Sequence, residues 1–264
     1  MSPADIAATA LGISAADIGS VEPIAHGLTN RSWLVRAGAQ AVVVRSSPPA
    51  EQALQIDRRS EYLVLHAVAA AGIGAPVLLD DAASQVLVTK YLGPVWTFED
   101  AGSTHNIARL GALLNRLHRL AVPPGVRFVD LAESVDGYVA TLAAQDAHPG
   151  LRSGDKRTRA RDIVASLSGG SISCLCHNDV HHLNVVDDGR SLRLIDWEYA
   201  GTGEPLFDLA SVCVYHSYAS PTRRELLSAY GRGSPERLEL ACWLFEYIRD
   251  LWFAVREVAV TDAR

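Results

Sequence analysis

Two short polar segments are the most informative part of the sequence for fold and function: HNDVHHLN at residues 177–184 and LIDWE at residues 194–198. Apolar runs at 172–176 and 192–195 predict a short strand before the first segment and another leading into the second. In phosphoryl transfer, one carboxylate orients and deprotonates the attacking hydroxyl, while an amide oxygen and a second carboxylate hold Mg²⁺. Asp179, Asn184 and Asp196 have these residue types in this order, and Mg²⁺ prefers their oxygen atoms to imidazole.

The same segments allow a second interpretation, a hydrolytic site for zinc or manganese. Imidazole and carboxylate groups both ligate such metals. This site would contain His177, Asp179, His181, His182 and Asp196. It predicts activity without ATP and a tightly bound transition metal, so these two segments alone leave both interpretations open.

The chain before these segments is rich in strand patterns. Short apolar runs bounded by Gly, Pro and polar turns predict antiparallel strands, and one stretch with helical spacing predicts a helix. The expected strands are 21–25, 32–36, 40–45, 77–79 and 85–91, and the expected helix is 57–71.

Beyond Gly93-Pro94 the pattern becomes mainly helical. Helices are expected at 106–120, 131–147, 158–167 and from 206 onward, with long stretches at 223–230 and 235–258. We therefore predict an α+β fold with two lobes: a small β-rich N-lobe at 1–92 and a larger, mainly helical C-lobe at 93–264. The hinge is expected near 91–94.

Composition narrows the class of protein. Of the 264 residues, 48% are hydrophobic and 20% are charged, which is ordinary globular usage and argues against intrinsic disorder. The net charge of −6 does not predict a nucleic-acid partner. No stretch supplies the ~20 apolar residues that span a bilayer. Four cysteines without a CxxC pair and a start without a basic signal region predict a reduced, cytoplasmic protein.

The pattern HxDxxxxN followed by IDxE resembles the aminoglycoside phosphotransferase and choline kinase superfamily, relatives of the protein kinases. HNDVHHLN and LIDWEYAG are closest in style to choline and thiamine kinases. The resemblance implies a protein-kinase-like fold that binds ATP and Mg²⁺. It implies Asp179 as catalytic base, with His177 in the catalytic set, Asn184 and Asp196 as metal ligands, and Asp208 as a brace of the catalytic loop.

The N-lobe matches are weaker. HGLTN at 26–30 is similar to the family's short phosphate loop, in which Gly27, Thr29 and Asn30 contact ATP phosphates. Arg45 ends a strand where a kinase places its lysine, and Glu61 on the next helix is expected to pair with it. An arginine there departs from the protein-kinase pattern but is common in choline and thiamine kinases. Its guanidinium suits a phosphate clamp.

Adenine is expected to lie along the hinge, on backbone groups of Lys90, Tyr91 and Leu92. The acceptor is expected to be a small hydroxyl compound, and the C-terminal helix suggests a cationic one. Carboxylates beside aromatic rings on one helical face suit an organic cation. The expected acceptor residues are Trp243, Glu246, Tyr247 and Asp250, together with Glu198 and His181. The role of His182 stays open.

The sequence therefore predicts an ATP-dependent kinase that phosphorylates a hydroxyl of a choline-, ethanolamine- or thiamine-like metabolite. Three alternatives remain: an aminoglycoside phosphotransferase, a nucleotide-binding pseudokinase, and the metal-dependent hydrolase. The pseudokinase conflicts with the intact Asp179, Asn184 and Asp196, and the hydrolase leaves Arg45 and Glu61 without a role.

Overall fold

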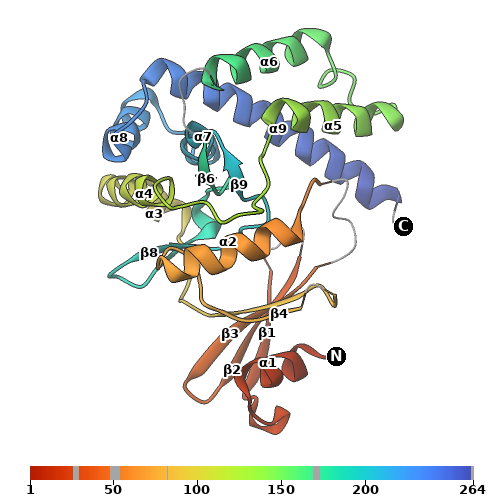
Figure 1. The fold of residues 1–264 in the computed structure, drawn as a ribbon, viewed down its shortest axis with the longest axis vertical. Coiled ribbons are helices and arrows are strands. Elements are labelled where there is room, and N and C mark those ends of the chain that lie inside the picture. Colours follow the sequence, from red (N-terminus) through yellow and green to blue (C-terminus); the bar gives the residue numbers. More distant parts are fainter. Residues whose placement is uncertain (26–29, 48–53, 82, 169–172, 263–264) are drawn as a thin grey trace.

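A five-stranded antiparallel sheet forms one half of the computed structural model, which describes residues 1–25, 30–47, 54–81, 83–168 and 173–262 (Figure 1). In sheet order the strands are β1 (Ser20–Ile24), β2 (Arg31–Ala37), β3 (Gln40–Ser46), β5 (Val86–Lys90) and β4 (Val77–Asp81). The five strands expected from the sequence are all present, within two residues at each end.

The central strand β3 separates two environments because its side chains alternate between the faces of the sheet. Val42 and Val44 are buried in a small core beneath α1 (Pro3–Leu11), whereas Val43 and Arg45 face the interior of the molecule and line a large cavity. The start of α1 is fixed by a capping box between Ser2 and Asp5.

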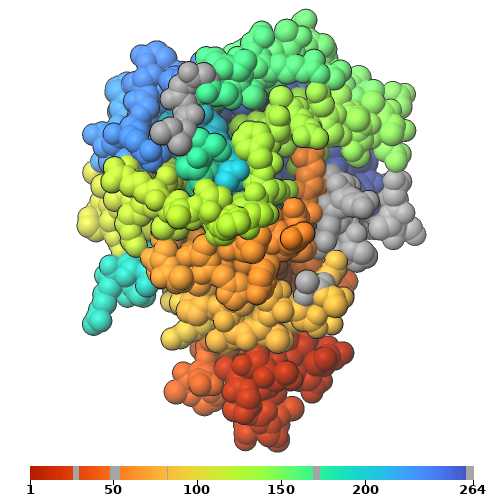
Figure 2. Space-filling model, in the orientation of Figure 1, coloured from red at the N-terminus to blue at the C-terminus, as the bar shows by residue number. Residues whose placement is uncertain are grey.

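Helix α2 (Arg58–Ala70) joins the sheet to the rest of the molecule. Asp57 caps its first turn, and Val64, Leu65 and Val68 enter the main hydrophobic core together with residues of the helical half. Leu54, just before α2, is buried in the same core. The space-filling view shows α2 against the helical half (Figure 2). The main core therefore crosses the expected lobe boundary.

The other half of the molecule is mainly helical. Its α-helices are α3 (Phe98–Gly102), α4 (Thr104–Leu117), α5 (Leu131–Ala144), α6 (Gly154–Ser168), α7 (Pro205–Tyr215), α8 (Ser220–Tyr230) and α9 (Pro235–Asp262). In the part of the chain that the structure describes, 3₁₀ turns are η2 (His182–Asn184) in this half and η1 (Ala15–Asp17) between α1 and β1. The predicted α+β class and kinase-like division into a sheet and a helical part are confirmed.

Two short strand pairs hold the polar segments of the helical half. β6 (Cys174–Cys176) pairs with β9 (Gly201–Gly203), and β7 (Val185–Asp187) pairs with β8 (Leu192–Leu194). β8 matches the strand expected at 192–195 within one residue, and the segment 195–198 that follows it is not a strand. Within the described residues, we find no helix with the length and apolar character that a membrane crossing requires.

Candidate active site

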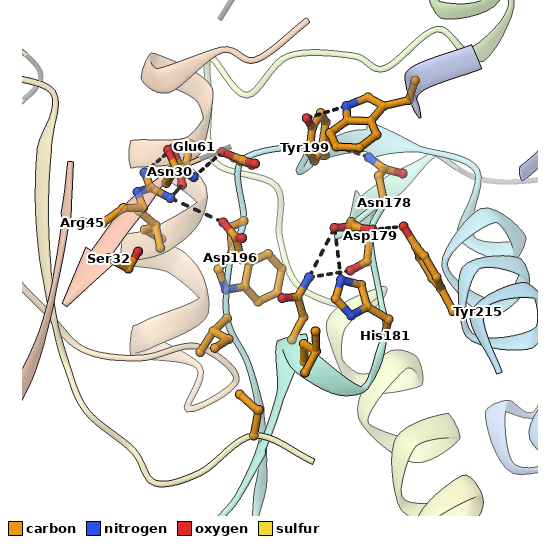
Figure 3. Close-up of a pocket in the computed structure, with 18 of the residues that line it drawn as sticks. Asn30, Ser32, Arg45, Glu61, Asn178, Asp179, His181, Asp196, Tyr199 and Tyr215 are labelled. Carbon is orange, nitrogen blue, oxygen red and sulfur yellow. Dashed lines mark hydrogen bonds and ion pairs between the residues drawn. The ribbon is translucent and has the colours of Figure 1, made fainter. Parts of the chain in front are cut away.

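A cavity of about 1020 Å³ lies between the sheet and the helical half. Its walls come from β2, β3, β5, α5, α7, α9 and the polar segments 177–184 and 195–199. Most predicted site residues line it: Asn30, Arg45, Glu61, Lys90, Tyr91, Leu92, Asp179, His181, Asn184, Asp196 and Glu198. Figure 3 shows Arg45 and Asp196 on one side of this space and Asp179 with Tyr215 on the other.

Asp208 lies beneath the segment that carries Asp179. Its carboxylate oxygens accept the backbone N–H groups of His177 at 2.9 Å and Asn178 at 2.6 Å, and one of them also contacts the ring of His118 at 2.9 Å. Asn178 has a φ of +67°, so the chain turns sharply there. The fully buried Asp208 thus holds this turn directly before Asp179.

His177 does not reach the cavity, so the predicted catalytic role does not fit its placement. Its side chain is fully buried and contacts the carbonyl of Ile195 through Nε2 at 2.9 Å. Its Nδ1 accepts the backbone N–H of Asp179 at 3.3 Å. Burial lowers the pKa of His177, which favours the neutral ring. His177 therefore ties the two polar segments together from behind.

Asp179 and Asn184 lie side by side at the cavity wall. The amide nitrogen of Asn184 donates to the backbone oxygen of Asp179 at 2.9 Å and to its Oδ2 at 3.3 Å. Because the nitrogen faces Asp179, the amide oxygen is the atom of Asn184 that can meet a cation. Burial alone would raise the pKa of Asp179, but His181, His177 and Tyr215 lower it below its ordinary value. Asp179 is therefore a carboxylate at neutral pH.

Asp196 adopts a left-handed backbone conformation, with a φ of +63°, and its side chain is 40% exposed at the cavity. Its Oδ1 lies 3.5 Å from Nη1 of Arg45. Reduced hydration inside the cavity raises the pKa of Asp196, and although Arg45 opposes this, Glu61 and Asp179 raise it further. An excess of negative charge beside two oxygen donors suits a divalent cation, so Asn184 and Asp196 fit the predicted Mg²⁺ site.

Arg45 and Glu61 form the pair that the sequence predicts. Two hydrogen bonds of 2.6 and 2.8 Å join the guanidinium to the two carboxylate oxygens. Arg58 adds a third, 2.7 Å from Oε2 of Glu61. Burial alone would lower the pKa of Arg45, but Glu61 and Asp196 raise it well above its ordinary value. The guanidinium therefore stays charged at the cavity wall.

Glu198, expected from the sequence to contact the acceptor, lies in a buried network of polar side chains. It is 3% exposed, accepts a hydrogen bond from Asn30 at 2.8 Å and pairs with Arg58 at 3.2 Å. Burial and the charge of Asp196 raise its pKa to about 7. Gly27 and Thr29, predicted with Asn30 to contact phosphates, lie outside the described residues.

The hinge residues follow β5 into the cavity wall. The N–H groups of Lys90 and Tyr91 donate to Pro76 and Ala41 at 2.9 and 3.0 Å. Of the three predicted hinge residues, Leu92 is the one whose N–H has no partner among the described residues, so we expect it to be the donor to a base.

The prediction that Trp243, Glu246, Tyr247 and Asp250 of α9 form the acceptor site was wrong. Trp243 packs beneath the guanidinium of Arg159 of α6 at 4.2 Å, and Tyr247 donates to the carbonyl of Leu151 at 2.7 Å. Neither these residues nor Glu246 and Asp250 line the cavity. The aromatic residues at this spacing pack against α6 and the loop that precedes it. Sequence periodicity does not distinguish such a packing face from a binding face. The cavity side of α9 consists of Phe245, Ile248, Arg249, Trp252 and Phe253.

Several cavity residues were missed by the sequence reasoning. Tyr199 lies directly after the second polar segment, and its hydroxyl accepts a 2.8 Å hydrogen bond from the indole of Trp252. Asp130, the N-cap of α5, and Glu133, in the first turn of α5, also line the cavity. The position of Tyr199 beside IDWE was an available signal. The others depend on how α5 and α9 pack.

The histidines of the alternative hydrolase do not assemble into one site. His177 is buried behind the segment, and His182 faces His216, with 3.3 Å between the ring nitrogens. Among the described residues, the group of three metal-ligating side chains within 4.8 Å is His118, Cys174 and Cys176. It is buried apart from the cavity, and both ring nitrogens of His118 already contact protein oxygens.

The sequence of this chain is similar to those of known proteins. A family model described as the phosphotransferase enzyme family matches residues 20–243. Protein LicA from Haemophilus influenzae is 26% identical over 190 residues, which cover 70% of this chain and 55% of that protein. The chain thus spans about half the length of this relative. Thiamine kinase from Salmonella paratyphi B is 39% identical over 80 residues, 30% of this chain and 24% of that protein.

A solved structure is similar over almost the whole chain. Choline kinase LicA from Streptococcus pneumoniae superposes with a TM-score of 0.80 at 20% sequence identity, covering 97% of this chain and 91% of that one. At this identity the likeness concerns the fold.

Proposed function

We propose, from the premise that this chain belongs to the phosphotransferase enzyme family, that it transfers the γ-phosphate of ATP to a hydroxyl of a small cationic metabolite. The acceptor is of the choline, ethanolamine or thiamine type. The observation that carries this proposal is the convergence of Asp179, Asn184, Asp196 and Arg45 on one cavity that also has an aromatic wall.

The roles follow from the groups at the cavity. The Asp179 carboxylate orients the acceptor hydroxyl and accepts its proton as the new P–O bond forms, while the bond between the γ-phosphorus and the β–γ bridging oxygen of ATP breaks and ADP leaves. Arg45, kept charged by Glu61, faces the phosphates. Asn184 and Asp196 would hold Mg²⁺, which supplies charge neutralisation on the phosphate oxygens when bound. Since the transition state is loose, positioning and charge compensation account for most of the catalysis.

The aromatic wall supports a cationic acceptor. The rings of Tyr199 and Trp252 are nearly perpendicular, with centroids 6.4 Å apart, and the hydrogen bond between them fixes their arrangement. Organic cations bind to such ring faces with about 0.5–2 kcal/mol for each contact. Asp130, whose carboxylate caps α5, and Glu133 also line the cavity and add negative charge there.

The test is acceptor-dependent release of ADP from ATP and Mg²⁺, with choline, ethanolamine, thiamine and two aminoglycosides as acceptors. Asp179→Asn, which keeps the size of the side chain, is the blank. We expect one of the first three to stimulate ADP release and the variant to lose roughly 10³-fold or more in turnover while still binding ATP. Stimulation by an aminoglycoside alone would show that the acceptor is an aminoglycoside rather than a choline-, ethanolamine- or thiamine-type metabolite. Absence of ATP binding would refute the proposed kinase function.

A further inference from the structure

One face of α7 contacts the Asp179 segment at successive points. Asp208 accepts the backbone N–H groups of His177 and Asn178, as described above. One turn later, the hydroxyl of Ser211 accepts the backbone N–H of Val180 at 3.1 Å. These contacts fix the backbone on both sides of Asp179 and do not involve its side chain.

Tyr215, one further turn along this face, contacts that side chain instead. Its hydroxyl donates to Oδ1 of Asp179 at 3.0 Å, and Figure 3 shows it reaching Asp179 from α7. The other carboxylate oxygen, Oδ2, is 3.3 Å from the amide nitrogen of Asn184 and 3.6 Å from Nε2 of His181. The carboxylate plane is therefore held from both sides.

The ring of Tyr215 is held independently of its hydroxyl. It packs against His181, with centroids 4.8 Å apart, and against Phe245 of α9, with centroids 5.4 Å apart. Loss of the hydroxyl alone should therefore leave the ring in place, while Asp179 loses the contact to its Oδ1 and keeps those of Asn184 and His181 to its Oδ2.

We propose that Tyr215 is a positioning residue that sets the orientation of the Asp179 carboxylate toward the acceptor hydroxyl, an inference that rests on the proposed kinase function. The terminal torsion of an aspartate is soft, so a carboxylate held on one side samples many orientations. Proton acceptance and in-line attack require a narrow range of them, and misplacement by about 1 Å can cost roughly 100-fold in rate.

The test compares Tyr215→Phe with Tyr218→Phe. The control removes a buried hydroxyl three residues away, which donates to the carbonyl of Ala101 and lies outside the cavity. We expect Tyr215→Phe to lower kcat roughly 10- to 100-fold, with KM for ATP and acceptor within about twofold of wild type, and the control to keep wild-type kcat. Unchanged kcat in Tyr215→Phe, or a rise in both KM values with loss of stability, would overturn the proposal.

A second measurement does not depend on turnover. In protein labelled with ¹³Cζ-tyrosine, Tyr215→Phe assigns the Tyr215 resonance. Asp179→Asn replaces its charged acceptor with a neutral one, so this resonance should move while that of Tyr218 stays. A Tyr215 resonance insensitive to Asp179→Asn refutes the contact even if wild type is active. Conversely, a sensitive resonance in a protein that no acceptor stimulates supports the contact while the proposed function fails.

Discussion

The guanidinium of Arg45 meets both carboxylate oxygens of Glu61, at 2.6 and 2.8 Å, across the gap between β3 and α2. Glu61 is 2% exposed, and Arg58 approaches it as a second cation. The same Arg45 lies 3.5 Å from Asp196, so one carboxylate orients the cation that faces the expected phosphate and metal positions. Through this pair, the position of α2 determines how the guanidinium of Arg45 is oriented in the cavity.

Glu61→Ala should therefore destabilise the fold as well as weaken nucleotide binding. It leaves two largely buried guanidinium groups without their shared carboxylate, and breaking a buried pair typically costs about 3–5 kcal/mol in the free energy of unfolding. Urea denaturation measures this loss. Glu22→Ala is the matched control, because Glu22 pairs with Arg36 at 4.0 Å and both side chains are about half exposed, so it should change the same quantity by less than about 1 kcal/mol. Equal effects of the two substitutions would contradict the prediction.

The two tryptophans of α9 should separate binding from packing. Trp252→Ala removes a ring from the cavity wall, so KM for a cationic acceptor should rise roughly 3- to 30-fold. Trp243→Ala removes a ring that packs under Arg159 outside the cavity, so the acceptor KM should stay near wild type. Steady-state kinetics with the acceptor found active measures both. A larger KM effect at Trp243 would restore the helical face expected from the sequence.

His216 should make stability fall on mild acidification. Burial lowers its pKa to about 4, from an ordinary value of 6.5, so the unfolded chain binds a proton that the folded protein excludes. Its stability contribution is present above pH 6.5 and is lost as the pH falls toward 4, and about 2 kcal/mol of it is lost by pH 5. His216→Phe, whose ring fits beside Phe98 and Tyr218, should remove this loss.

The measurement is the free energy of unfolding of wild type and His216→Phe at pH 7 and pH 5. Glu198 has a raised pKa of about 7, so its protonation in the folded protein raises the free energy of unfolding as the pH falls. This effect opposes that of His216. The difference between the two proteins isolates His216, because Glu198 is common to both. His66→Phe, at an exposed site on α2, is the control. Parallel stability curves for wild type and His216→Phe would refute the prediction.

The sequence was informative where chemistry depends on neighbours in the chain. Asp179 and Asn184 are five residues apart in one short segment and contact each other. The Val run ending at Arg45, followed by a helix with Glu61, predicted a pair that the structure contains. Local patterns also predicted the strands of the sheet, because alternation and turn residues report one exposed and one buried face.

The sequence was uninformative where helix packing decides which face is used. Trp243 and Trp252 are both aromatic positions on α9, and only the arrangement of α5, α6 and α7 puts the second one at the cavity. The sequence neighbours of His177 suggested a catalytic role, but the turn at Asn178 directs its side chain into the interior. The short strand β9, Gly201–Gly203, has no side-chain pattern that could have predicted it.

Asp196→Asn should separate stability from function at the metal position. Reduced hydration inside the cavity and nearby carboxylates raise the pKa of Asp196, so its negative charge is unfavourable without a cation, and asparagine tolerates the left-handed φ of +63°. In EDTA, the variant should therefore unfold at the same urea concentration as wild type or a higher one. Added Mg²⁺ with ATP should stabilise wild type more than the variant, because ligands that bind the folded state raise its stability. Phosphoryl transfer should fall at least about 100-fold, since the neutral amide holds the cation weakly. A variant that is less stable in EDTA, or that gains as much from Mg²⁺ and ATP as wild type, would show that Asp196 serves the fold rather than the metal.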